Sequence, residues 1–176
     1  MTNVSNHQNQ GYTLVELIIY LAIMSTLMVS FIYYTISITT TRAKSNTIQE
    51  VQANARTALE VISNAVRDAS GVNLGASTFD VDPGVLSLVN DDPAKNPTII
   101  SLDQDDGTLQ IKEGASPTLN VTSGLVKVTN LAFSHENPLD EHGNIKLQMT
   151  IDHSATTGGV EYDYAYDLET SINLRK

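Results

Sequence analysis

The sequence predicts an α+β protein in which one long N-terminal helix packs on a C-terminal antiparallel β domain. Two observations predict this fold class. No proline or glycine occurs between Tyr12 and Ala69, and over this segment the apolar residues change from a continuous run to a stripe at helical spacing. After Val72, apolar and polar residues alternate in short runs separated by turn residues, a pattern that is typical of antiparallel strands.

The pattern divides the chain into four consecutive segments. We expect a leader peptide at residues 1–11, a membrane-crossing helix at 12–41, an amphipathic half of the same helix at 42–70, and a globular antiparallel β domain at 71–176. Residues 14–38 are apolar apart from Glu16 and scattered Ser, Thr and Tyr, and about 20 such residues are enough to cross the hydrocarbon core of a bilayer. The leader has no lysine or arginine, unlike a cleaved secretory signal. We therefore expect the apolar helix to stay on the protein.

The second half of the helix is predicted from apolar residues at steps of three and four. These include Val51, Ala55, Ile62 and Ala69, which form one stripe. We expect Gly71 to end the helix as its C′ residue. A helix over residues 12–70 would be about 88 Å long at about 1.5 Å per residue.

Seven runs of the C-terminal part are predicted to be strands. The clearest is "NIKLQMTID" at residues 144–152, which alternates without a break. "LVKVTNLAF" alternates with a slipped phase that predicts a β-bulge. The others are "VEYDYAYDLETSINL", "VLSLV", "TIISL", "TLQIK" and "TLNVT". We expect the stripe of the helix to cover one face of the resulting sheet.

Charge and composition exclude several kinds of protein. The formal charge is −10, and the whole excess lies in residues 71–176, which hold sixteen acidic and six basic side chains. Such a surface repels phosphate, so we predict no nucleic-acid partner for the acidic domain. There is no cysteine, which excludes disulfides and thiol chemistry. The common catalytic and phosphate-binding motifs are missing, so we predict neither an enzyme nor a cofactor.

Glu16 is the only charged residue from Tyr12 to Thr41. A charge inside hydrocarbon is costly, although less so near the interface, where the first turn of the helix would lie. If such helices pack side by side with axial offsets, the carboxylate needs an opposite charge and so sets the register between subunits. An alternative is purely local, because Thr13 and Glu16 have the spacing of a helix capping box.

The polar leader, the segment "GYTLVEL" at residues 11–17 and the long helix before a small β domain together resemble the type IV pilin-like family. This family comprises pilins, minor pilins and the pseudopilins of type II secretion. The resemblance implies that a prepilin peptidase cuts between Gly11 and Tyr12, that Tyr12 is then N-methylated, and that Glu16 pairs with the ammonium group of a neighbouring subunit. The chain departs from the family in having Tyr instead of Phe at the mature N-terminus, no basic residue in the leader, and no Pro or Gly early in the helix.

The resemblance also implies partners and a location. The partners are prepilin peptidase, other pilin or pseudopilin subunits that contact the N-terminal helix, and the cytoplasmic membrane before assembly. The precursor would cross that membrane once with the β domain outside, and later form part of a cell-surface pilus or a periplasmic pseudopilus. Arg42 and Lys44 oppose this orientation under the positive-inside rule, while the ammonium created at Tyr12 by cleavage favours it.

Several assignments within the family stay open. The β-rich domain, the absence of a disulfide loop and the ending "YDLETSINLRK" favour a minor pilin or a J-type pseudopilin. A major pilin is an alternative. So is a permanently anchored surface binding or adhesin domain that never polymerises. The Gly11–Tyr12 bond distinguishes this last case, because only a filament subunit needs it to be cut.

The loop "DQDDG" at residues 103–107 has two interpretations. Asp103, Asp105 and Asp106 could supply oxygen ligands to calcium, although no glutamate occupies the distal position of an EF-hand. Asp-Gly is also the usual turn of a hairpin, here between "TIISL" and "TLQIK". The hairpin interpretation is favoured, and we predict no metal site.

Overall fold

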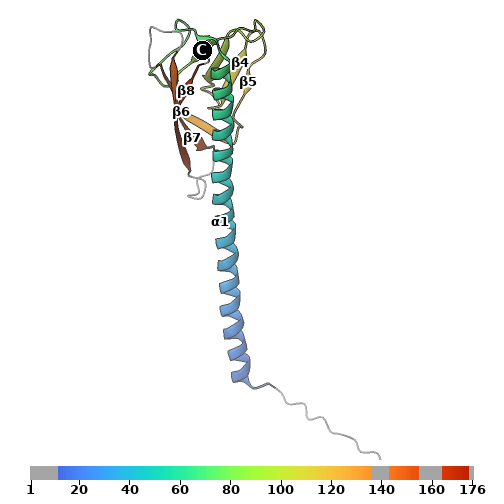
Figure 1. Ribbon diagram of the computed structural model, residues 1–176. Helices are drawn as coiled ribbons and strands as arrows, with labels where there is room; N and C mark the ends of the chain where they lie inside the picture. The colour runs from blue at the N-terminus through green and yellow to red at the C-terminus, as the bar shows by residue number, and fades with distance from the viewer. Residues whose placement is uncertain (1–11, 136–142, 155–163, 175–176) are drawn as a thin grey trace, which may run out of the picture. The chain divides into compact units, whose positions relative to one another are not determined.

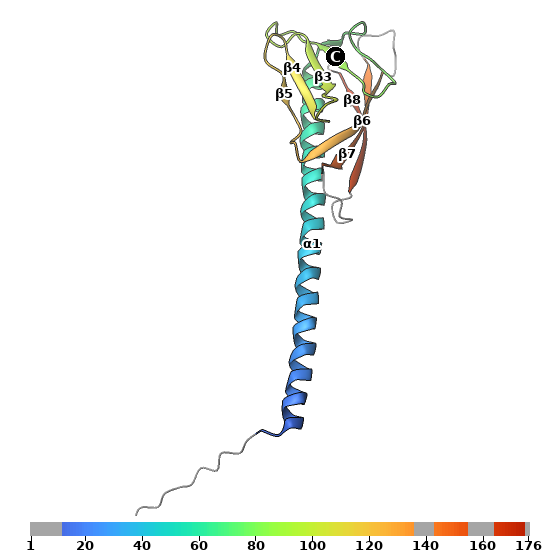
Figure 2. The ribbon, with the colours of Figure 1, turned by 180° about the vertical axis from the view of Figure 1, so that it is seen from behind.

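The computed structural model describes residues 12–135, 143–154 and 164–174. One helix, α1 (Leu14–Asp68), precedes all the strands. Figures 1 and 2 show it as a single uninterrupted helix. The strands are β1 (Gly71–Val72), β2 (Leu86–Val89), β3 (Thr98–Leu102), β4 (Leu109–Glu113), β5 (Leu119–Asn120), β6 (Val126–His135), β7 (Asn144–His153) and β8 (Ala165–Asn173). The predicted α+β class, with a long N-terminal helix and antiparallel strands, is confirmed.

The chain divides into two compact units, residues 1–42 and 43–176. The described part of the first unit is helix from Leu14 onward, and its large apolar side chains are exposed. By its length and composition alone, α1 is able to cross a membrane, and its most apolar stretch of 18 residues is not buried. The described residues of this unit therefore form no core of their own.

The described residues of the second unit form two antiparallel sheets instead of the single sheet that we expected. The first has the order β1-β2-β3-β4-β5 and the second has the order β6-β7-β8. The two sheets are separate in both views of the ribbon (Figures 1 and 2). Strand pairing in the first sheet ends at β5, which is only two residues long, and the chain then begins a new sheet at β6.

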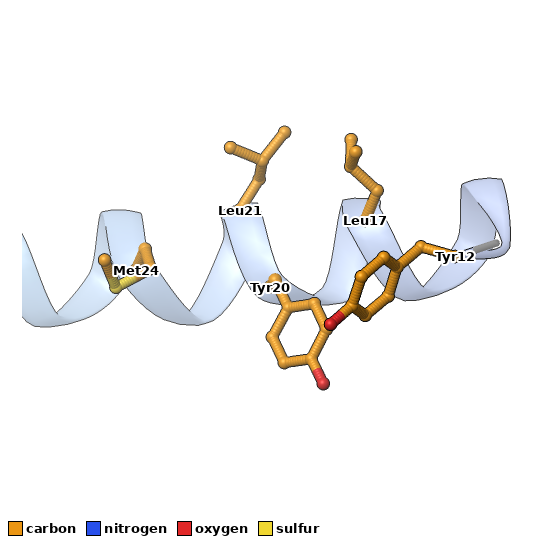
Figure 3. A pocket seen from close by; sticks show the side chains of 5 residues that line it. All are labelled: Tyr12, Leu17, Tyr20, Leu21 and Met24. Carbon is orange, nitrogen blue, oxygen red and sulfur yellow. The ribbon is translucent and has the colours of Figure 1, made fainter. Parts of the chain in front are cut away.

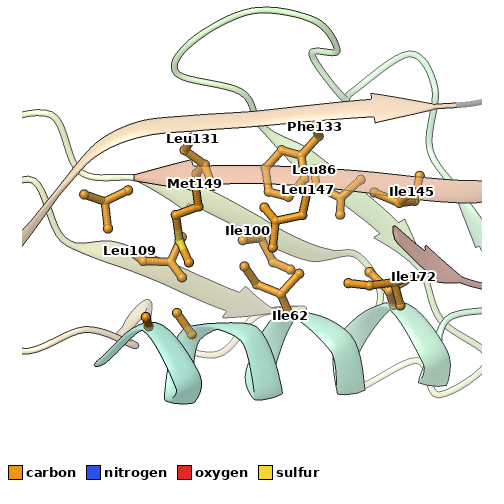
Figure 4. Packing of buried hydrophobic residues seen from close by; sticks show 14 of the residues in the cluster. Ile62, Leu86, Ile100, Leu109, Leu131, Phe133, Ile145, Leu147, Met149 and Ile172 are labelled. Atoms are coloured by element: carbon orange, nitrogen blue, oxygen red, sulfur yellow. The ribbon is translucent and has the colours of Figure 1, made fainter. Parts of the chain in front are cut away.

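One apolar core joins both sheets to the second half of α1. The buried helical residues recur at steps of three and four, as predicted: Thr47, Val51, Asn54, Ala55, Ala58, Ile62 and Val66. Ile62 points from the helix toward the strands that carry Phe133 and Leu147 (Figure 4). Leu86, Ile100 and Leu109 extend the same cluster into the first sheet.

The predicted bulge and hairpin are both present. The pairing of β6 with β7 shifts register between Val128 and Asn130, as the slipped alternation predicted. β3 pairs with β4, and the turn between them closes with a 2.8 Å hydrogen bond from the Gly107 amide to the Asp103 carbonyl. Gly107 has φ +67°, which is the conformation for which glycine is favoured at such a turn.

The end of the helix differs from the prediction, because Gly71 is not a C′ residue. It is the first residue of β1 and pairs with Val89. The Ala69 amide still bonds to the Ala65 carbonyl at 3.2 Å, while the next amide, of Ser70, donates to Val89 at 2.9 Å. The chain thus passes from helix to strand without a left-handed residue, and tertiary pairing replaces the cap.

Candidate functional site

The start of α1 is built by a local cap. The Thr13 hydroxyl accepts a hydrogen bond from the Glu16 amide at 3.3 Å, so Thr13 acts as the N-cap and the helix begins at Leu14. This is one half of the predicted capping box. In the part of the chain that the structure describes, the partner recorded for the Glu16 carboxylate is not the Thr13 amide. It is the hydroxyl of Tyr20.

Tyr20 lies one turn beyond Glu16, and its hydroxyl donates to Glu16 Oε1 over 3.4 Å. The Tyr12 ring packs edge-on against the Tyr20 ring, with centroids 6.4 Å apart and planes at 81°. From Tyr12 to Ser37, Glu16 is the one residue that is partly buried, and the others are exposed. The carboxylate is therefore shielded by its own helix and has a neutral phenol as its partner.

Leu17, Leu21 and Met24 continue the surface beside the two tyrosines and line an apolar hollow with them. Figure 3 shows Leu17 and Leu21 along one edge of this hollow and Tyr12 and Tyr20 along the other. No other charged side chain occurs before Arg42. Arg42 lies 26 residues further along α1, about 39 Å at about 1.5 Å per residue, so it cannot pair with Glu16 of the same helix.

The structure describes only one of the two residues that flank the predicted cleavage site. Tyr12 is described and is 78 % exposed. Gly11 lies outside the described residues, as do the rest of the leader and the scissile bond. The predicted roles of Gly11, Tyr12 and Glu16 in cleavage, methylation and assembly stay predictions at this point.

The Asp103–Gly107 turn uses the first of its carboxylates for internal hydrogen bonds. Asp103 Oδ1 accepts from the Asp105 amide and Oδ2 accepts from Gln110 Nε2, both at 3.0 Å. Asp105 and Asp106 are exposed. Among the described residues, no group of three or more His, Asp or Glu is placed to hold a metal ion. The hydrogen bonds of Asp103 fit the hairpin interpretation, and calcium binding there is left as an untested alternative.

Sequence reasoning missed two residues. Tyr20 could have been found from its position four residues after Glu16, the spacing at which helical side chains meet. Asn54 lies in the apolar stripe, is 8 % exposed, and accepts a hydrogen bond from the Ser123 amide at 2.8 Å. A polar residue in a buried stripe needs a partner, but its identity, 69 positions away in the chain, is not visible in the sequence.

The comparisons with known proteins identify the N-terminal segment. Residues 6–32 match the model of the prokaryotic N-terminal methylation motif. This match contains the leader-to-helix junction, Glu16 and Tyr20. No curated protein and no solved structure gives a significant match to the chain.

Proposed function

We propose that this chain, a type IV pilin-like protein by its methylation motif, is a minor structural subunit of a pilus-like or type II secretion pseudopilus filament. The motif indicates a precursor that a prepilin peptidase processes and that assembles with other pilin subunits. The apolar helix near the N-terminus fits a membrane-anchored precursor. The class of the subunit, the type of filament and the final location are parts of this proposal.

Three residues have specific roles in the proposed pathway. Cleavage between Gly11 and Tyr12 removes the leader and creates an ammonium group at Tyr12, which is then methylated. Glu16 accepts that ammonium group from a neighbouring subunit during assembly. In the membrane, before assembly, the Tyr20 hydroxyl is the partner of Glu16.

The observation that supports this proposal most directly is the isolation of Glu16 on an exposed apolar surface. Its partner within the helix is uncharged, and the large side chains from Leu14 to Ile36 are half or more exposed. Once these side chains pack against other helices, water leaves and the carboxylate becomes costly without a cation. A neighbouring N-terminus supplies one at the right end of the helix.

The second unit is proposed to lie outside the cytoplasmic membrane and to act as a structural head, neither as an enzyme nor as a nucleic-acid-binding domain. Its acidic excess supports the absence of nucleic-acid contact. Its β-rich fold without a disulfide supports the minor class over a major pilin.

Intact-mass measurement of the native protein tests the proposal. A mass equal to Tyr12–Lys176 plus one methyl group is expected. A retained leader would show that the chain is a permanent membrane anchor instead. Quantitative mass spectrometry of isolated filaments then tests the class, because a minor subunit must be far less abundant than the main subunit.

A further inference from the structure

Most hydroxyl groups of α1 in the first unit donate to a group of the same helix, including those of Thr35, Thr39, Thr40 and Thr41 beyond Tyr33. Before Tyr33 the hydroxyl groups of α1 are satisfied inside the helix: Tyr20 donates to Glu16, Ser25 and Thr26 donate to the Ala22 carbonyl, and Ser30 donates to the Thr26 carbonyl. The Ser and Thr bonds are 2.9 Å long. A helix surface of this kind leaves no side-chain donor unpaired in hydrocarbon.

The first hydroxyls in α1 that have no hydrogen bond within the described chain are those of Tyr33 and Tyr34, followed by Ser37. Tyr33 is 78 % exposed and Tyr34 is 64 % exposed. An unpaired hydroxyl inside the hydrocarbon layer is costly, whereas a tyrosine at the lipid–water interface keeps its ring in the apolar layer and its hydroxyl in the headgroups. Because the two residues are consecutive, their rings cover different sides of the helix.

The length of the helix also supports a lipid–water interface at Tyr33 and Tyr34. From Leu14 to Ile32 the helix is about 28 Å long at about 1.5 Å per residue, close to the hydrocarbon thickness of about 30 Å. Tyr12 lies just before this stretch and Tyr33 just after it. A span that continued to Thr41 would be about 42 Å long at the same rise, which exceeds the hydrocarbon core.

We infer that Tyr33 and Tyr34 bind the headgroup layer of the bilayer and fix the depth of the anchor, so that the hydrocarbon-crossing part is Leu14–Ile32. Residues 35–41 then lie in and beyond the headgroups. The inference rests on the proposed function in one respect, namely that the precursor crosses a bilayer.

The chain is suited to a direct test because it contains no tryptophan. Single tryptophans replace Ile23, Tyr34 or Thr39 in the full chain, which is reconstituted in phosphatidylethanolamine–phosphatidylglycerol vesicles. Fluorescence is quenched by lipids brominated near the glycerol, by lipids brominated near the chain end, and by iodide in the water. We expect I23W to be quenched most by the deep bromines, Y34W most by the shallow bromines, and T39W severalfold more by iodide than Y34W.

The possible outcomes separate the inference from its premise. If Y34W is quenched most by the deep bromines, or T39W most by the shallow ones, the hydrocarbon extends past Tyr34 and the inference is wrong while the anchor stands. If I23W is quenched by neither brominated lipid, the chain does not cross the bilayer and the anchored precursor is wrong as well.

A second set of variants tests the hydroxyls themselves. With T39W as the reporter, Tyr33→Phe and Tyr34→Phe together remove the two hydroxyls and keep both rings. The helix should sink, and iodide quenching of T39W should fall severalfold. Ser25→Ala and Ser30→Ala together are the matched control, because each of these hydroxyls already donates to a carbonyl of the helix, and they should leave the quenching unchanged. Unchanged quenching in the double variant would show that the hydroxyls do not set the depth.

Discussion

The Ser123 amide donates a hydrogen bond to Asn54 Oδ1 over 2.8 Å, which ties the loop before β6 to the middle of the buried face of α1. The Asn54 amide group in turn donates to the Glu50 carbonyl and to Glu50 Oε1, at 2.9 and 3.0 Å. Ser123 Oγ also donates to Glu50 Oε1, at 3.3 Å. These three residues form a small polar network beside the apolar core.

Asn54→Ala should destabilise the protein by about 1–3 kcal/mol, because it leaves the partly buried Ser123 amide without an acceptor. Asn64→Ala is the control, since Asn64 is an exposed asparagine on the same helix, and it should change stability by less than about 0.5 kcal/mol. Urea unfolding of the detergent-solubilised full chain, followed by tyrosine fluorescence, measures both. Equal effects of the two substitutions would contradict the role assigned to Asn54.

Gly114→Ala should destabilise the protein by more than about 2 kcal/mol. Gly114 has φ +52°, and a Cβ atom there would lie 2.3 Å from the Ala94 carbonyl oxygen, so the backbone would have to move. At Gly124 a Cβ atom would meet nothing within 4 Å, and Gly124→Ala should be close to neutral. Thermal unfolding of the two variants side by side makes the comparison, and a neutral Gly114→Ala would show that the turn rearranges easily.

Glu16→Gln should lower filament incorporation by about tenfold or more, because a charge-assisted hydrogen bond contributes about 1.5–3 kcal/mol. Gln keeps the size of the side chain and its ability to accept from Tyr20, so only the pairing with a cation is lost. The measurement is the amount of subunit in sheared filaments relative to the membrane fraction. Glu60→Gln, an exposed glutamate in the second half of α1, is the control and should assemble normally.

Tyr20→Phe should reduce the amount of precursor in the membrane, and the reduction should be larger with Glu16 than with Gln at this position. The 3.4 Å bond is long, so the expected effect is about 0.5–1 kcal/mol, or roughly two- to fivefold. In a Glu16→Gln background, Tyr20→Phe should lower the amount of precursor by less, because the acceptor of the Tyr20 hydroxyl is no longer charged. Quantitative immunoblotting of membranes from the four strains of this double-mutant cycle gives the coupling. Additive effects would mean that the two side chains act independently.

The contribution of Glu169 to stability should depend on pH. The hydrogen bond and charge of Lys146, with a further hydrogen bond from Gln148, lower the pKa of Glu169 below its ordinary value. Because the folded-state pKa is the lower one, the stabilisation is present above the unfolded value of about 4.3 and disappears as the pH falls through the folded value. Glu169→Gln should therefore lower Tm slightly at neutral pH and not in acid. The pair is exposed, so added salt should reduce the neutral-pH difference, and a salt-independent difference would contradict this explanation.

The features that the sequence predicted correctly depend on local patterns. Alternation places β3, β4 and β7 within a residue or two of their true bounds, and the Asp-Gly turn joins the first two of these strands. The stripe that includes Val51 and Ile62 identifies the buried face of the helix, because burial requires a repeat of three and four residues. The position of Glu16 also follows from sequence, as one charge in an uncharged segment.

The features that the sequence did not predict depend on contacts between distant residues. Gly71 enters a strand because Val89 is there to pair with it, and a cap rule applied to the helix alone has no access to that partner. The division into two sheets depends on where strand pairing ends after Asn120, which alternation does not encode. The hydrogen bond from the Ser123 amide to Asn54 could not be predicted either, because the sequence does not show that this loop lies beside the helix.

The contact between the second half of α1 and the two sheets has a mechanical consequence. Buried residues line the helix from Thr47 to Val66, and the chain enters β1 only after the helix has ended. A pull along the helix axis therefore loads these contacts together, in shear, before tension reaches the Gly71–Val89 pair. Rupture in that geometry requires many contacts to fail at once, so a subunit held by its helix should resist tensile force better than one joined to its head at a single point.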